Sequence, residues 1–275
     1  MNNLLQILNI ASPLLLITIA ALISEYAGRM AMFLDGIINL GAFLFYTFAV
    51  KTGLAFPSIL ISVLLCTLMI FIAERIASLL HGNMFLVSLA LNIFCSALVT
   101  LLSAQIFGTR GVLYSPDFKF DPVTARIYTS IICLGISIIT IIILKNTRLG
   151  LSIRISGSDT QVLDGRGISS DAIKSLSWCI TAAFGAFVGC SMALRLSSFV
   201  PGMSGGRGWT ALAAVFLGKK NPLLVLLAVI VFALCEYLST YIQNISFFAN
   251  MPSSILLSLP YLIALLLIII IPKRK

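Results

Sequence analysis

Long apolar runs separated by short polar segments dominate this chain of 275 residues. The runs lie at 4–23, 32–50, 54–73, 84–107, 125–144, 175–196, 207–218, 222–242 and 254–271. A transmembrane helix needs about 20 apolar residues. The runs are continuously apolar, whereas a transmembrane barrel alternates with a period of two. The pattern therefore predicts an all-α, polytopic helical bundle of eight or nine spans, forming one transmembrane domain over residues 1–275.

The run at 207–218 is too short for a standard span. It predicts either a half-helix or a span that begins earlier, within 197–206. The composition agrees with a membrane protein, because 60% of the residues are hydrophobic and only 10% are charged, against about 25% charged in soluble domains. The six cysteines stand singly in apolar runs without metal or redox spacing, so we expect them to be packing residues.

The net charge of +9 would suggest a nucleic-acid partner in a soluble protein. Here Lys and Arg concentrate in loops and at the C-terminus, so they predict topology instead, and no nucleic-acid partner is expected. The segment 145–174, Lys219-Lys220 and the terminal 273–275 are predicted to be cytoplasmic. The intervening runs then cross four times, and the N-terminus lies outside unless a re-entrant segment near 24–40 reverses it.

The polar segment 145–174 is the most unusual feature between the runs. Leu149, Ile153 and Ile155 lie among basic residues, which is compatible with a short helix along the membrane face. Ser156-Gly157-Ser158-Asp159 should end this helix and cap the next turn. Such a helix can dock a soluble partner, although an ordinary cytoplasmic loop would have the same basic composition.

Three stretches carry polar residues within apolar surroundings. In 24–43, Asp35 and Asn39 share a helical face, and Gly36 and Gly41 permit close approach. An ionisable residue in a span is a functional candidate, but Asp35 could instead pair with Arg29 or cap a helix end.

In 201–218, glycines precede the short run, and a half-helix start there would favour a polar ligand at membrane depth. Arg207 adds a hydrogen-bond donor and Trp209 a stacking surface, although Trp209 also suits an interfacial belt. Asn92 is central in its run, where bonding to a neighbouring helix would be enough to explain it.

These stretches resemble the permease subunits of ATP-binding-cassette importers for nucleosides and simple sugars, the ribose-type and branched-chain-amino-acid-like permeases. The resemblance is carried by Thr147-Arg148-Leu149-Gly150-Leu151 with Arg154, Gly157 and Gly167-Ile168, by Gly206-Arg207-Gly208-Trp209 with 211–216 and Asn221-Pro222, by Ser88-Leu89-Ala90-Leu91-Asn92, and by Leu259-Pro260-Tyr261-Leu262. The matches keep their order along nearly the whole chain and look most like the shorter permease of the nucleoside subgroup.

The resemblance implies a permease of the bacterial inner (plasma) membrane without enzymatic activity or a cofactor of its own. A second permease subunit, a cytoplasmic ATPase that binds ATP-Mg and an extracytoplasmic solute-binding protein are the implied partners. The substrate-path candidates are Asp35, Asn39, Phe43, Asn92, Arg207 and Trp209. The candidates for coupling to the ATPase are Arg148, Leu149, Gly150, Arg154, Gly157 and Asp159.

One departure bears on the substrate. Ala31-Met32-Phe33 replaces the subgroup's Asn-Ile-Gly, and Asp35 stands where a Glu is usual. This leaves riboflavin or a simple sugar as alternatives to a nucleoside. Two other classes stay open: an ion-coupled secondary transporter that uses Asp35 or Glu236, and a membrane enzyme, which the single His and scattered Cys disfavour.

Overall fold

A computed structural model describes residues 3–118, 120–243 and 262 of the chain. Apart from an isolated bridge between Leu113 and Phe199, every regular element in this part is a helix. The helices are α1 (Asn3–Tyr26), α2 (Leu34–Thr52), α3 (Ala55–Leu79), α4 (Met84–Phe107), α5 (Pro122–Asn146), α6 (Arg148–Ser158), α7 (Thr160–Asp164), α8 (Ser170–Leu196), α9 (Arg207–Leu217) and α10 (Pro222–Gln243). The predicted all-α class is confirmed.

Seven of the described helices are long and apolar enough to cross a membrane: α1, α2, α3, α4, α5, α8 and α10. The short apolar helix α9 agrees with the half-helix predicted for 207–218. The predicted run at 254–271 lies outside the described residues except for Leu262. The structure thus confirms a multi-span helical bundle, with seven candidate spans among the described residues.

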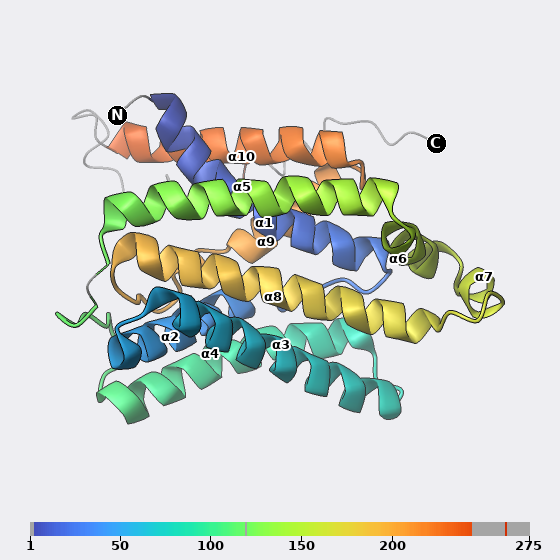
Figure 1. Ribbon diagram of the computed structural model, residues 1–275, viewed down its shortest axis with the longest axis horizontal. Coiled ribbons are helices and arrows are strands. Elements are labelled where there is room, and N and C mark those ends of the chain that lie inside the picture. Colours follow the sequence, from blue (N-terminus) through green and yellow to red (C-terminus); the bar gives the residue numbers. More distant parts are fainter. Residues whose placement is uncertain (1–2, 119, 244–261, 263–275) are drawn as a thin grey trace.

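The bundle is built around α8, which runs through its middle in Figure 1 and packs most extensively against α2. Small residues make this contact close. A Cβ atom on Gly189 would lie 2.1 Å from the carbonyl oxygen of Ile38, and one on Gly41 would lie 2.6 Å from Ala186. Such contacts hold membrane helices together, because no hydrophobic force drives their association within lipid.

The outer helices expose apolar side chains instead. Residues such as Leu64 on α3, Ile93 on α4 and Ile139 on α5 are each more than half exposed. Large exposed apolar patches are rare on soluble monomers, so these faces suit contact with lipid or with another membrane chain. Five of the six cysteines are buried and none is in a disulfide, which confirms their predicted packing role.

The short helices α6 and α7 lie at one end of the bundle, the right-hand end in Figure 1, which we call the loop end. Lys220 reaches this end, where it pairs with Glu25 at 2.9 Å. The opposite end holds the bridge between Leu113 and Phe199. Two of the three basic segments predicted to share one side of the membrane, 145–174 and Lys219-Lys220, are therefore at one end of the molecule, and the third, 273–275, lies outside the described residues.

The connection 27–33 between α1 and α2 is not helical. It leaves α1 at the loop end, and α2 then runs to the opposite end, where Phe43 meets Phe199 and Phe45 meets Phe118. The segment near 24–40 therefore does not return to its starting end. The structure therefore does not have the re-entrant segment near 24–40 that would have moved the N-terminus to the other side of the membrane.

Candidate functional site

Asp35, in the first turn of α2, lies against the start of α9. The backbone N–H of Gly208 donates to Asp35 Oδ1 at 3.2 Å. A Cβ atom on residue 208 would lie 2.5 Å from the Asp35 nitrogen, so the approach requires glycine. A carboxylate at a helix N-terminus is favoured by the partial positive charge there. Asp35 thus caps a second helix, as one reading of the sequence proposed, while remaining partly exposed.

Asn39 and Asn92 join the same region. Asn39 donates to Ser204 Oγ at 2.8 Å and accepts from the Ser204 backbone N–H at 3.0 Å. Asn92 Oδ1 accepts from the backbone N–H of Gly36 at 2.6 Å. We call the set Asp35, Gly36, Asn39, Asn92, Ser204 and Gly208 the central junction. It ties α2 to α4, to α9 and to the segment that precedes α9.

Two hydroxyls on α4 continue from Asn92 in a row that sequence reasoning missed. Ser96 and Thr100 are exposed, and each donates to the carbonyl oxygen four residues earlier, at 3.1 and 3.0 Å. Their lone pairs remain available as acceptors. The spacing of four within an otherwise apolar helix was the signal that could have revealed this row.

The other predicted path residues lie elsewhere. Phe43 is fully buried, with its ring 5.4 Å from that of Phe199. Trp209 is 39% exposed on α9. Arg207 forms an ion pair with Glu236 on α10 and is not bonded to the central junction in the described residues. The structure therefore brings together Asp35, Asn39 and Asn92, but not the full predicted set.

The predicted coupling segment forms two short helices separated by a capped break. Thr147 caps α6 by accepting from Gly150, and Asp159 caps α7 by accepting from Gln161 at 3.0 Å. This confirms the expected helix and the N-cap at Asp159, but the predicted break at 156–159 was too early, because α6 continues through Ser158. The apolar residues of α6 divide between two faces, because Ile153 is buried while Leu149 is 52% exposed.

Arg148 and Arg154 are also exposed on α6. Gly150 packs so closely on the end of α5 that a Cβ atom would lie 2.4 Å from the Leu144 carbonyl oxygen. At the other end of α6, a Cβ atom on residue 157 would lie 2.1 Å from the carbonyl oxygen of Tyr26, the last residue of α1. Both ends of α6 are therefore held against membrane-spanning helices, while its basic residues face outward.

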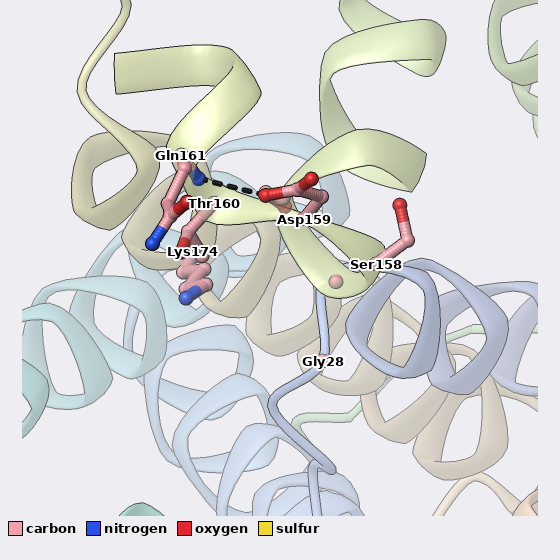
Figure 2. Close-up of a pocket in the computed structure, with 8 residues that line it drawn as sticks. Gly28, Ser158, Asp159, Thr160, Gln161 and Lys174 are labelled. Atoms are coloured by element: carbon pink, nitrogen blue, oxygen red, sulfur yellow. Dashed lines mark hydrogen bonds between the residues drawn. The ribbon is translucent and has the colours of Figure 1, made fainter. Parts of the chain in front are cut away.

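A pocket of about 290 Å³ opens where α6 ends and α7 begins (Figure 2). It is lined by Gly28, Lys174 and residues 156–161. Gly28 adopts a left-handed conformation (φ +74°) and contacts Gly157. The pocket therefore lies between the α6–α7 break and the connection that leads into α2.

An ion-pair network holds this connection in place. Arg29 binds the buried carboxylate of Glu74 on α3 and, at 2.8 Å, the exposed carboxylate of Asp171 on α8. Its carbonyl oxygen accepts from Trp178 Nε1 at 2.9 Å. Glu74 Oε2 is buried without a hydrogen-bond partner in the described residues. A single arginine therefore joins α3 and α8 to the entrance of α2.

The profile of a protein family described as "Branched-chain amino acid transport system / permease component" matches residues 3–272. The guanosine ABC transporter permease protein NupQ of Bacillus subtilis is 26% identical, over 93% of this chain and 87% of that protein. The nucleoside ABC transporter permease protein NupC of Lactococcus lactis is also 26% identical, over 94% and 88%. A putative glucose ABC transporter permease protein, TsgC13 of Haloferax volcanii, is 32% identical over only 38% of this chain and 32% of its own length.

Two solved structures share the fold. One is PsaBC from Streptococcus pneumoniae in complex with Fab, with a TM-score of 0.57, 16% identity and coverage of 99% of this chain and 93% of that one. The other is an inward-facing conformation of a putative metal-chelate type ABC transporter, with a TM-score of 0.58, 17% identity and coverage of 98% and 86%. At these identities the likeness concerns the arrangement of helices alone.

Proposed function

The chain belongs to the family of permease components of branched-chain amino acid type transport systems, and from that premise we propose that it is the permease subunit of an ABC importer of nucleosides. The observation that carries the proposal is the similarity to NupQ and NupC over nearly the full lengths of all three chains. A multi-pass protein of the inner (plasma) membrane is the form that such a subunit takes.

The proposed path runs past the central junction and the polar row on α4. Asn92, Ser96 and Thr100 offer hydrogen-bonding groups without formal charge, which suits the ribose hydroxyls and base edges of a neutral nucleoside. Asp35 and Trp209 are the next candidates, since both are partly exposed. We expect a second permease subunit to complete the path, because the row on α4 faces outward.

We further propose that the loop end faces the cytoplasm and docks a separate ATPase chain, where ATP-Mg binds. Arg148, Leu149, Arg154 and the pocket beside Asp159 form the contact surface in this proposal. Nucleotide binding can shift the permease only by contacting its two states differently. The close contact of Gly157 with the end of α1 and with Gly28 would pass such a shift to the connection that leads into α2.

Uptake of labelled inosine tests the proposed substrate. Cells with and without the gene are compared, with unlabelled uridine, riboflavin and ribose as competitors. We expect deletion to abolish inosine uptake and uridine to compete. Competition by ribose instead would favour a sugar as the substrate. The partial match to TsgC13 supports that alternative. Inosine uptake unchanged by deletion would contradict the nucleoside proposal, and labelled riboflavin would then be tested in the same strains.

The energy source is tested in the same cells. We expect uptake to continue when a protonophore collapses the proton gradient while ATP stays high. Asp35 is bonded to the start of α9 and Glu236 is paired with Arg207, so neither carboxylate stands alone as an ion site. Loss of uptake under these conditions would favour an ion-coupled secondary transporter.

A further inference from the structure

A second cavity lies between α1, α5, α8 and α10, toward the opposite end from α6 and α7, and has a volume of about 590 Å³. Its lining includes the three arginines Arg126, Arg195 and Arg207. We call it the arginine cavity. Nothing in the proposed transport of a neutral nucleoside requires this accumulation of positive charge.

The cavity has more positive than negative charge. In the described residues the only ion pair of these arginines is that between Arg207 and Glu236. Arg195 is held by neutral acceptors, which are Asn9 O at 2.6 Å, Thr129 Oγ1 at 2.8 Å, Ser130 Oγ at 2.9 Å and Ser12 Oγ at 3.3 Å. Arg126 is exposed at the rim. Two of the three guanidinium groups therefore lack a carboxylate partner within the described part of the chain.

Arg207 also retains unused hydrogen-bonding capacity. Its Nε atom is buried without an acceptor, and one terminal nitrogen meets only the sulfur of Met192, at 3.7 Å. The Arg207 side chain is 24% exposed, so its terminal nitrogens, rather than Nε, can donate to an acceptor inside the cavity. The planar guanidinium fork suits phosphate oxygens in particular.

Most of the rest of the lining is apolar or aromatic, and its other polar residues are Gln6, Asn9 and Thr240. Ile10, Pro13 and Val200 face the cavity, and Tyr237 and Tyr241 lie beside it with their rings stacked at 6.2 Å. Tyrosines of this kind concentrate where a membrane meets water. The cavity thus combines a cationic group with an apolar wall, as a binding site for a lipid headgroup and its first carbon atoms would.

We propose that the arginine cavity binds a phosphate-bearing amphiphile, with the phosphate placed among Arg126, Arg195 and Arg207. An anionic membrane phospholipid is one source of this chemistry, and a soluble phosphate ester is the other. Bound between α1, α5, α8 and α10, the anion would offset part of the positive charge of the arginines and connect these helices. The proposal is independent of the substrate that the permease carries.

The test measures lipid binding to the purified full-length chain in detergent by native mass spectrometry, with phosphatidylglycerol and phosphatidylcholine of equal chain length. We expect phosphatidylglycerol to bind at least about tenfold more tightly, as one additional charge-assisted contact would give. Arg126→Glu should remove this preference. Arg126 is substituted instead of Arg195, because Arg195 also bonds residues of α1 and α5 and its loss would disturb the fold. Arg110→Glu, an exposed reversal outside the cavity, is the matched control.

Glycerol 3-phosphate separates the two sources. If it competes with phosphatidylglycerol at millimolar concentration, the cavity recognises the phosphate alone and a soluble ester is also a ligand. If it does not compete, the lipid is the ligand. Equal binding of the two lipids to the unmodified protein would overturn the proposal, and so would equal loss of the preference in Arg126→Glu and Arg110→Glu.

Discussion

The start of α2 shows how single side chains hold an irregular part of the bundle together. Asp35, Asn39 and Asn92 each bond a backbone group of another segment. Within lipid such groups have no water to bond, so an unsatisfied one is costly. The same side chains therefore have a structural role, and a transport role has to be tested with residues whose loss leaves these bonds intact.

Ser96 and Trp209 are suited to this test. Within the part of the chain that the structure describes, the Ser96 hydroxyl bonds only its own helix, and Trp209 is partly exposed. Replacing Ser96 with alanine should leave the melting temperature unchanged, whereas Trp209→Ala also removes partly buried packing contacts and should lower it. Uptake should fall about 2–10-fold for Ser96→Ala, because this factor corresponds to the free energy of one neutral hydrogen bond to the substrate. Ile93→Ala, an exposed apolar change on α4, is the control, and normal uptake by both test variants would mean that the path lies elsewhere.

Gly157→Ala should disturb the seat of α6. The new methyl group would lie 2.1 Å from the Tyr26 carbonyl oxygen, and overpacking of this kind costs about 1–3 kcal/mol. Gly135 on α5 has no atom within 4 Å of the same position, so Gly135→Ala should be neutral or slightly stabilising. Thermal unfolding in detergent compares the two. Equal melting temperatures would show that α6 is not held by this contact.

These residue roles were only partly accessible from sequence. The spacing of Asp35 and Asn39 predicted a shared face, and the glycines predicted close approach, because both follow from helix periodicity. The bond between Asn39 and Ser204 spans 165 positions, and no local pattern encodes a pairing at that separation. For the same reason Arg207 could not be assigned to Glu236, and Phe43 could not be placed in the core.

The connection 27–33 and the helices around it form the element that would transmit motion from the loop end. Arg29 lies within this connection and binds both α3 and α8. Gly28, next to it, contacts Gly157 at the end of α6. A displacement of α6 therefore acts directly on the chain that enters α2 and the central junction.

Arg29→Ala should destabilise this element strongly. It would leave the Glu74 carboxylate, whose side chain is only 2% exposed, without its ionic partner, and breaking a buried pair in this way costs about 3–5 kcal/mol. Asp171→Asn removes the exposed partner, with a side chain that is 68% exposed, and should cost about 1 kcal/mol or less. Thermal unfolding compares the two variants. Similar decreases in melting temperature would contradict a structural role for the buried ion pair between Arg29 and Glu74.

Reversing both arginines of α6, Arg148→Glu with Arg154→Glu, should uncouple ATP hydrolysis from uptake. The two side chains face outward and make few contacts that hold the fold, so the protein should still reach the membrane. The measurement pairs ATPase activity with uptake in reconstituted vesicles. A double reversal of Lys51 and Arg110, which lie outside the loop end, is the control. Normal uptake by the α6 variant would remove the docking proposal.

For the whole molecule, hydropathy predicted the helices well but not all of their ends. The run at 175–196 becomes α8 from Ser170, because its first turn is polar yet helical. Hydropathy marks the portion suited to lipid, whereas the helix is defined by backbone bonds and can begin earlier. The collection of α6, α7 and Lys220 at one end was likewise predictable from basic residues, since these follow topology.

Cysteine labelling tests the orientation of the whole bundle. The loop end carries most of the described basic residues outside the spans, so it should face the cytoplasm. Ser158→Cys and Arg166→Cys should react with a membrane-impermeant maleimide only in inside-out vesicles, and Lys51→Cys and Arg110→Cys only in intact cells. The unsubstituted protein, whose cysteines are buried or half-buried, gives the background. Labelling of Ser158→Cys in intact cells would show that the molecule has the opposite orientation, with α6 out of reach of any cytoplasmic ATPase.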